Sequence, residues 1–233
     1  MKKPFLIAHW RNLINITYKV PPELLYAYLP KGTNLDVQEG SAFVSLVAFE
    51  FLDTKVKGVP IPFHINFPEI NLRFYVKYGE ERAVCFIREY VPKQAIAFIA
   101  KVLYNEPYKA IPMQCSLKET AKQFTVRHKG QIGKNHFSIN LVADKTSYTP
   151  SSDSVAHYFK EHDIGFGRDK KGNTLYYKVN HDVWEVYPVK SYELILDFAV
   201  LYGKKWQFLN DAVPHHVLLA KGSDVAVYSP EML

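Results

Sequence analysis

Short strand-like runs recur along this chain, and they constrain its fold more than any other feature. Residues 12–20 and 174–179 alternate between apolar and polar side chains with the two-residue period of a β-strand, and residues 41–52 and 70–77 are rich in Phe, Val, Tyr and Leu. Further strands are predicted at residues 82–88, 217–220 and 224–228. A Gly-containing turn interrupts two further runs within residues 124–144, which predicts a long hairpin. Aromatic residues, which favour strand surfaces and pocket walls, make up 15% of the chain. The sequence therefore predicts a strand-rich protein.

Helical patterns are few and short. Proline opens one at residues 21–29 and another at 92–103, and Ser151, Ser152 and Asp153 form an N-cap cluster before 155–159. About nine strands to three helices, without regular βαβ alternation, favour an antiparallel barrel or cone over a doubly wound sheet. We find no repeat or linker and expect one domain over residues 1–233.

Cysteine content and hydropathy indicate the cellular compartment in which the protein is expected. The two cysteines, Cys85 and Cys115, have no CxxC spacing, and we expect both to be free thiols. The first residues contain too short an apolar stretch for a secretory signal. No run approaches the roughly 18 apolar residues of a membrane span. These features predict a cytoplasmic protein without a membrane partner.

The net charge of +6 is compatible with an anionic ligand or with a nucleic-acid surface. The lysines are scattered, and the pairs Lys170-Lys171 and Lys204-Lys205 are typical of solvated turns, so no nucleic-acid partner is expected. The motifs GxGxxG, GxxxxGK[ST], HExxH and GxSxG are absent, which argues against nucleotide, zincin and serine-hydrolase chemistry. His215 and His216 would point to opposite strand faces, so we expect no metal site and no cofactor.

One polar row is the most informative local feature. In a strand, Glu69, Asn71 and Arg73 share one face, while the residues between them are apolar. Inside a barrel this row would line a ligand site, where the Arg73 guanidinium suits a carboxylate and Glu69 suits proton transfer. On a barrel exterior it would be a salt-bridged, solvated face. The row by itself leaves both interpretations open.

Several segments together form a pattern known from one protein family. Residues 14–30, and the Glu-x-Asn-x-Arg-x-Tyr-Val pattern within Phe67–Val76, resemble the first segment and a strand of the YqjF-like branch of the acetoacetate decarboxylase superfamily. Tyr104–Lys109 resembles the helix-end motif in which true decarboxylases carry Gly-x-Pro-Lys-Lys, and His181–Trp184 resembles a His-x-x-Trp motif. The similarity covers nearly the whole chain but is weak over residues 191–206. It implies an α+β fold, with a mostly antiparallel cone or barrel enclosing a pocket and a few short peripheral helices.

The chain departs from the decarboxylase pattern at the nucleophile. The resemblance places Tyr108 where decarboxylases carry the Schiff-base lysine, and Lys109 where they carry the neighbouring lysine. A phenol cannot form an imine, and Lys109 could do so only if the loop shifted by one residue, without an adjacent cation to lower its pKa. Lys19 falls at the position of a substrate-binding arginine and lacks the bidentate fork. We therefore expect no acetoacetate decarboxylation.

Other candidates have simpler alternatives. His181 and Trp184, three residues apart on an extended stretch, would lie on opposite faces unless a bulge intervenes, with one of them facing the cavity and the other packed. His64, in the proline-rich loop, is either a lid residue or simply exposed. Glu161 is either a surface charge or a site residue.

The sequence is compatible with two functions. The first is a non-catalytic binder of a small, largely apolar metabolite, an anionic one included, in which Lys19, Arg73, Tyr108, His181 and Trp184 contact the ligand. The second is a cofactor-independent lyase or decarboxylase-like enzyme acting on a small keto or carboxylic acid. In that enzyme Glu69 would be the general acid and base, and only Lys109 could offer covalent catalysis. The sequence leaves the oligomeric state open, a homo-oligomer included.

Overall fold

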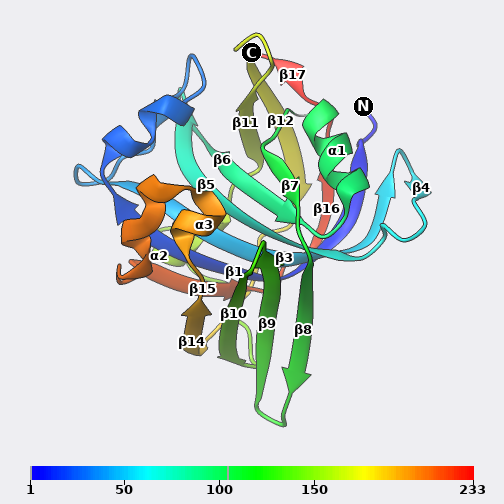
Figure 1. The fold of residues 1–233 in the computed structure, drawn as a ribbon, viewed down its shortest axis with the longest axis vertical. Coiled ribbons are helices and arrows are strands. Elements are labelled where there is room, and N and C mark those ends of the chain that lie inside the picture. Colours follow the sequence, from blue (N-terminus) through cyan, green and yellow to red (C-terminus); the bar gives the residue numbers. More distant parts are fainter. Residues whose placement is uncertain (1, 104) are drawn as a thin grey trace.

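The computed structural model describes residues 2–103 and 105–233, and β-strands dominate it (Figure 1). Seven strands form a closed barrel: β1 (Leu6–Val20), β16 (Asp224–Val227), β12 (Thr174–His181), β11 (Ile164–Arg168), β6 (Glu81–Val91), β5 (Phe67–Tyr78) and β3 (Ala42–Val56). The ring closes because β3 also pairs with β1 along nearly its whole length. Around this ring β6 and β11 run parallel, and the other neighbours run antiparallel. The predicted mostly antiparallel barrel is confirmed.

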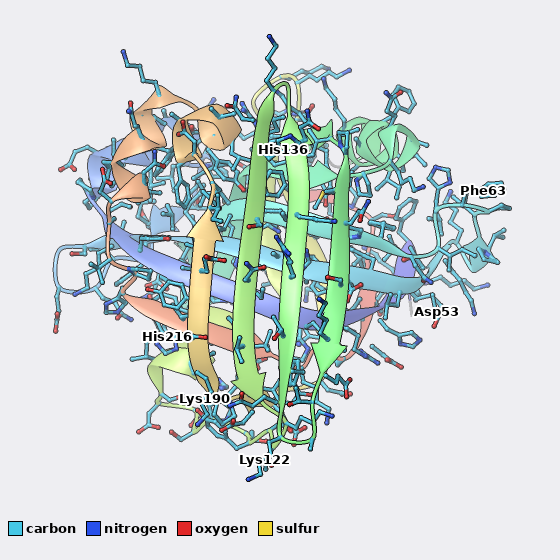
Figure 2. All side chains as sticks on the ribbon, turned by 60° about the horizontal axis from the view of Figure 1, so that its bottom comes forward. Asp53, Phe63, Lys122, His136, Lys190 and His216 are labelled. Carbon is cyan, nitrogen blue, oxygen red and sulfur yellow. The ribbon has the colours of Figure 1, made fainter. Side chains whose placement is uncertain are left out.

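A second sheet of four antiparallel strands packs across the outside of the barrel. In spatial order it contains β14 (Val189–Ile195), β10 (Asn135–Asp144), β9 (Gln123–Ile132) and β8 (Met113–Glu119). Figure 2 shows these strands crossing in front of the barrel strands. The predicted hairpin is β9 and β10, whose two-residue turn places Gly133 at a φ of 57°. The weakly matching stretch after residue 190 contains most of β14, a strand that the sequence pattern did not predict.

The remaining strands are short and extend the barrel sheet. They are β2 (Asn34–Leu35), β4 (Val59–Pro60), β7 (Tyr108–Ala110), β13 (Val186–Tyr187), β15 (His216–Ala220) and β17 (Glu231–Met232). The loop predicted at 58–68 thus contains β4 and the start of β5.

Three α-helices are present among the described residues: α1 (Gln94–Leu103), α2 (Val155–Lys160) and α3 (Phe198–Tyr202). The helix predicted at 21–29 is instead a pair of 3-10 turns, η1 (Pro22–Leu24) and η2 (Tyr26–Tyr28), and a third, η3 (Lys204–Asn210), follows α3. Two prolines at the start and Pro30 at the end leave too few residues for a stable α-helix. The cap of α2 is Ser154, whose Oγ accepts a hydrogen bond from His157 N at 3.2 Å, rather than the preceding cluster.

The long barrel strands bury both of their faces, and this separates two cores. Outward-facing residues of β3 and β5 pack beneath the second sheet, among them Val44, Leu46, Ile70 and Leu72. Inward-facing residues form the barrel interior, among them Phe43, Val47, Phe49, Phe51 and Phe67. The alternation of side chains along β3 and β5 separates the residues of the two cores. A polar residue on the inner face therefore points into the barrel.

Helices close the two ends of the barrel interior. The inner face of α1 places Ala95, Ile96, Ile99 and Ala100 over one end. At the other end, α2 inserts the ring of Phe159 between those of Phe43 and Tyr75, with centroids 5.1 and 5.3 Å apart. The interior that remains open lies between these two plugs.

The last hairpin, between β15 and β16, fixes the start of β1. Trp10 N donates to Ser223 O at 2.9 Å, so the turn lies against the backbone of β1. Gly222 in this turn has a φ of 80°, and a Cβ there would lie 2.0 Å from Trp10 O. Only glycine fits this position.

Two expectations about thiols and membranes can be compared with the structure. Cys85 is buried and Cys115 half-buried, and both are free. Across residues 2–103 and 105–233, every helix is too short or too polar to cross a lipid bilayer.

Candidate functional site

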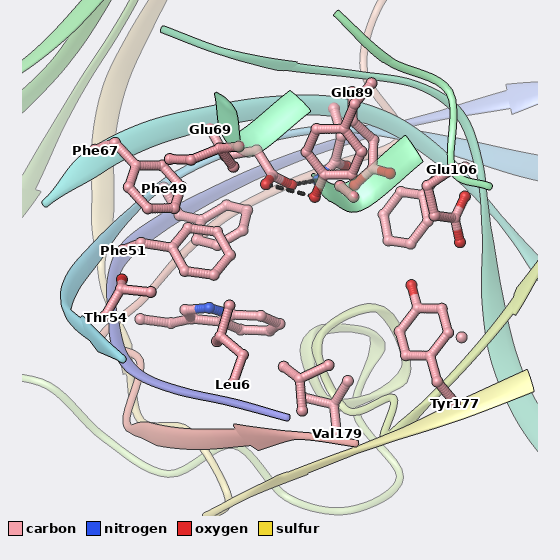
Figure 3. A pocket seen from close by; sticks show the side chains of 18 of the residues that line it. Leu6, Phe49, Phe51, Thr54, Phe67, Glu69, Glu89, Glu106, Tyr177 and Val179 are labelled. Carbon is pink, nitrogen blue, oxygen red and sulfur yellow. Dashed lines mark hydrogen bonds between the residues drawn. The ribbon is translucent and has the colours of Figure 1, made fainter. Parts of the chain in front are cut away.

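A cavity of about 170 Å³ lies inside the barrel beneath α1. Its walls are mostly aromatic and aliphatic (Figure 3). The rings of Phe51 and Phe67 stack with centroids 4.7 Å apart, and the Trp10 indole meets Phe49 and Phe51 edge-on. Such walls favour an apolar ligand body.

One end of this cavity holds three buried glutamates. Glu69 comes from β5, Glu89 from β6 and Glu106 from the segment before β7, and all three line the cavity. Their exposed fractions are 2%, 2% and 5%. Figure 3 shows them on the same side of the pocket, with Tyr177 opposite Glu106. We call Glu69, Glu89 and Glu106 the glutamate cluster.

Two side chains hold Glu69 in place. Asn71 Nδ2 donates to Glu69 Oε1 at 3.0 Å, and the Tyr108 hydroxyl donates to Glu69 Oε2 at 2.8 Å. Asn71 lies on the same face as Glu69 because side chains alternate along β5. Tyr108 lies close to Glu69 because β7 pairs parallel with β6, which places Tyr108 beside Glu89. The carboxylate of Glu69 is therefore oriented by donors from two strands.

A β-bulge decides the position of Glu89. The register of β5 against β6 shifts between Leu72 and Arg73, so that Ile87 is an extra residue on β6. Phe86 and Glu89, three residues apart, consequently both face the cavity. Uninterrupted alternation would have turned Glu89 outward, which is why sequence reasoning missed it.

Burial controls the protonation of the cluster. It raises the pKa of Glu69 to about 6, against hydrogen bonds from Asn71 and Tyr108 that lower it. It raises the pKa of Glu106 to about 8, with Tyr177 lowering that value and the charge of Glu69 raising it. Burial, followed by the charges of the other two glutamates, raises the pKa of Glu89 well above its ordinary value. At neutral pH the cluster therefore carries about one negative charge rather than three.

A second polar group occupies another part of the wall. The Arg73 guanidinium donates to Phe159 O at 2.8 Å, and its Nε is buried without a hydrogen-bond partner. His162 also lines the cavity, and neither of its ring nitrogens has a partner. Burial, followed by the charges of Arg73 and Arg82, holds the pKa of His162 well below its ordinary range. His162 is therefore a neutral imidazole.

The two lysines proposed from the sequence lie outside the cavity. Lys109 is exposed on β7, because it follows Tyr108 in a strand and so points the opposite way. Lys19 is exposed near the end of β1, paired across the sheet with Phe43. Among the described residues that line the cavity there is no lysine. The cavity therefore lacks both Lys19, for which a ligand contact was predicted, and Lys109, for which covalent catalysis was predicted.

His181 and Trp184 do not lie on opposite faces. β12 ends at His181, and the chain then turns, so that the two rings stack with centroids 4.3 Å apart. Trp184 lines the cavity, and its Nε1 donates to Ser223 Oγ at 2.9 Å. His181 instead borders a separate surface groove beside Asp182. Of the two residues for which a ligand contact was predicted, Trp184 therefore lines the cavity and His181 does not.

The structure shows the positions of His64 and Glu161, for each of which the sequence allowed two roles. His64 is half-buried and lines the cavity from the loop between β4 and β5. Glu161 is half-buried and bonds to Lys160 and to the backbone N of Trp184, which makes it a structural ion pair. Tyr104, in the helix-end motif, lies outside the described residues.

The structure brings Glu69, Asn71, Arg73, Tyr108 and Trp184 to one cavity. The sequence reasoning assigned no site role to Glu89, Glu106, His162 or Tyr177. Tyr177 had one available signal: Gly165 lies opposite it in the β11–β12 pair, and a Cβ there would lie 2.3 Å from the tyrosine ring. Across the described ranges, no three His, Cys, Asp or Glu side chains are arranged to hold a metal ion.

Comparison with solved structures gives the fold. The chain superposes on acetoacetate decarboxylase from Legionella pneumophila with a TM-score of 0.66 and 14% identity, covering 99% of this chain and 88% of that one. An acetoacetate decarboxylase-like enzyme from Sphingomonas wittichii RW1 gives 0.65 and 12%, covering 100% and 94%. The enduracididine biosynthesis enzyme MppR complexed with pyruvate gives 0.65 and 11%, covering 100% and 91%.

Sequence comparison gives the family. "Uncharacterized protein YqjF" from Bacillus subtilis (strain 168) is 23% identical over 178 residues, which are 75% of this chain and 72% of that protein. Residues 7–224 match the DUF2071 family, described as "Uncharacterized conserved protein (COG2071)". This chain therefore belongs to the DUF2071 family, as a distant YqjF homologue with the acetoacetate decarboxylase-like fold.

Proposed function

We propose that this protein binds a small, largely apolar molecule inside its barrel and holds the polar group of that molecule at the glutamate cluster. The observation that supports this most strongly is an internal cavity of about 170 Å³ with apolar walls and a few convergent polar groups. An apolar cavity of about 150 Å³ is enough to hold benzene. The ligand is therefore about the size of one or two rings.

The position of the lysines supports binding without imine chemistry. Tyr108 points at Glu69, and Lys109 points into solvent. A Schiff-base lysine must be neutral, which requires burial or a neighbouring cation. Borohydride treatment in the presence of pyruvate should therefore leave Lys109 unlabelled, and labelling there would restore the imine mechanism.

The binding proposal can be tested by filling the cavity. Ala100 lines the cavity from α1, and Lys101 is its exposed neighbour on the same helix. We expect benzyl alcohol and indole to raise the melting temperature of the natural protein and to bind in calorimetry. Ala100→Trp should weaken binding at least tenfold, whereas Lys101→Trp should leave it unchanged. If both variants bind equally well, or if benzyl alcohol, indole and benzylamine all fail to bind, the proposal is wrong.

A second candidate function is acid–base catalysis on a small keto acid. It is favoured by Glu69, whose pKa of about 6 suits a general base, and by the Tyr108 hydroxyl beside it. The Glu69 carboxylate would take a proton from the carbon next to the carbonyl, the enolate oxygen would accept a hydrogen bond from Tyr108, and the Glu69 carboxyl would return a proton. The carboxylate of the substrate would bind at Arg73.

Pyruvate in deuterium oxide tests this candidate. The structurally similar MppR was solved with pyruvate, which guides the choice of probe. We expect deuterium to enter the methyl group faster than in buffer, with a half-maximal rate near pH 6, and Glu69→Gln to abolish the effect. Glu80→Gln, at an exposed position, is the control. Exchange that continues in Glu69→Gln would exclude this role.

A further inference from the structure

Three buried polar oxygens at and beside the glutamate cluster have no hydrogen-bond partner. Both oxygens of Glu69 are occupied by Asn71 and Tyr108. Glu89 Oε1, Glu106 Oε1 and Asn71 Oδ1 are buried and have no hydrogen-bond partner. Asn71 is uncharged and only 2% exposed, so its orphaned acceptor is an observation independent of the acidic side chains. Buried polar atoms are rarely left unpaired.

Among the described residues, no cation donates a hydrogen bond to the cluster. Arg73 lines the same cavity, but its Nη2 donates to Phe159 O at 2.8 Å. No lysine lines the cavity within the described part of the chain. The donors that hold Glu69 are an amide and a phenol. A buried carboxylate without a cation is costly, which is why Glu89 and Glu106 keep their protons at neutral pH, and a ligand that supplies a cation lowers the cost of ionising them.

We infer that the ligand carries a primary ammonium group on an apolar body, and that this group is bound by the free acceptors of Glu89, Glu106 and Asn71. The inference rests on the proposed binding function and names its ligand class. An ammonium has three N–H donors, which matches three acceptors from β5, β6 and the segment before β7. Hydrogen bonds between ions are stronger than neutral ones. An alcohol offers only one hydrogen-bond donor to these acceptors, and the negative charge of the glutamate cluster repels a carboxylate.

This class of ligand has a protonation signature. The titratable groups that face the free acceptors are Glu69 on β5, Glu89 on β6, Glu106 and Tyr108 around the start of β7, and Tyr177 on β12, with Arg73, His162 and His64 elsewhere on the wall. Burial keeps Glu106 mostly protonated at neutral pH, since its pKa is about 8. A bound ammonium favours the ionised carboxylate, so binding releases a proton and tightens as pH rises.

Three compounds that share one ring test the inference: benzylamine, benzyl alcohol and benzoate. We expect benzylamine to bind at least tenfold more tightly than benzyl alcohol at pH 7.5, and benzoate to bind more weakly than either. Calorimetry in phosphate and in Tris should show proton release with benzylamine and none with benzyl alcohol. The affinity for benzylamine should rise at least threefold between pH 6.0 and 8.5.

Substitutions locate the effect. Glu89→Gln should lose the preference for benzylamine over benzyl alcohol, because glutamine cannot ionise when the ammonium binds, whereas Glu80→Gln makes the same substitution in an exposed turn and should keep the preference. If Glu89→Gln does not fold, the proton release and the pH dependence of benzylamine binding to the natural protein test the ammonium inference instead. Binding of benzyl alcohol at least as tight as that of benzylamine overturns the ammonium inference and leaves the binding function standing. Binding of neither overturns both.

Discussion

Glu106→Gln should make the protein more stable at alkaline pH and leave it almost unchanged at pH 5. The Glu106 side chain is 5% exposed, and its Oε1 has no hydrogen-bond partner. Glutamine has nearly the same shape but never ionises. The substitution therefore removes the cost of burying a charge without leaving a hole.

The magnitude follows from the pKa of this group. Burial raises the pKa of Glu106 to about 8 from an ordinary value of 4.5. Between these two values the folded protein keeps a proton that the unfolded chain releases, so the free energy of unfolding falls as pH rises. This contribution is fully present below pH 4.5 and lost above pH 8. A difference of about 3.5 in pKa, at 1.36 kcal/mol each, sets an upper bound of roughly 5 kcal/mol, and relaxation of the site brings the expected effect to about 2–4 kcal/mol.

Urea denaturation at pH 5, 7 and 9 measures this effect. The natural protein should lose stability relative to Glu106→Gln as pH rises, with the two converging at pH 5. Glu80→Gln, at an exposed position, should follow the natural protein at every pH. Parallel stability curves for the natural protein and Glu106→Gln would refute the reasoning, since they would mean that Glu106 ionises in the folded state without cost.

Three further outcomes follow from the same structure. Tyr108→Phe removes the donor to Glu69, so the pKa of Glu69 should rise above about 6 in a carbon-13 NMR titration, and an unchanged value would show that the hydrogen bond is not formed. Burial lowers the pKa of His128 to about 3 from 6.5, so the free energy of unfolding falls as pH falls from 6.5 to 3. In urea denaturation, His128→Phe should lose less stability between pH 7 and pH 4 than the natural protein. An equal loss of stability in the two proteins would contradict this. Gly222→Ala should cost about 3 kcal/mol or more, because it combines a positive φ with a 2.0 Å backbone clash. Gly40→Ala, with a similar φ and nothing within 4 Å, should cost only about 1 kcal/mol, and equal losses in urea would exclude the clash.

Much of the fold and part of the site could be predicted from local sequence alone. The two-residue period identified the long strands and placed Glu69, Asn71 and Arg73 on one face, because alternation is a property of each strand by itself. The hairpin at 124–144 was also predictable from local sequence, because its alternating runs flank turn residues. The resemblance to the acetoacetate decarboxylase superfamily supplied the barrel that turned this face inward.

Contacts between distant segments decided the rest. Glu89 faces the cavity because of a register shift against β5, and Tyr108 reaches Glu69 through the parallel pairing of β7 with β6. The same pairing turns Lys109 outward. The sequence by itself determined which residues alternate and where the turns fall, since these depend on neighbouring residues. Only the tertiary structure determined which side chains share the cavity and what burial does to their pKa values, because pairing register and desolvation depend on segments far apart in the chain.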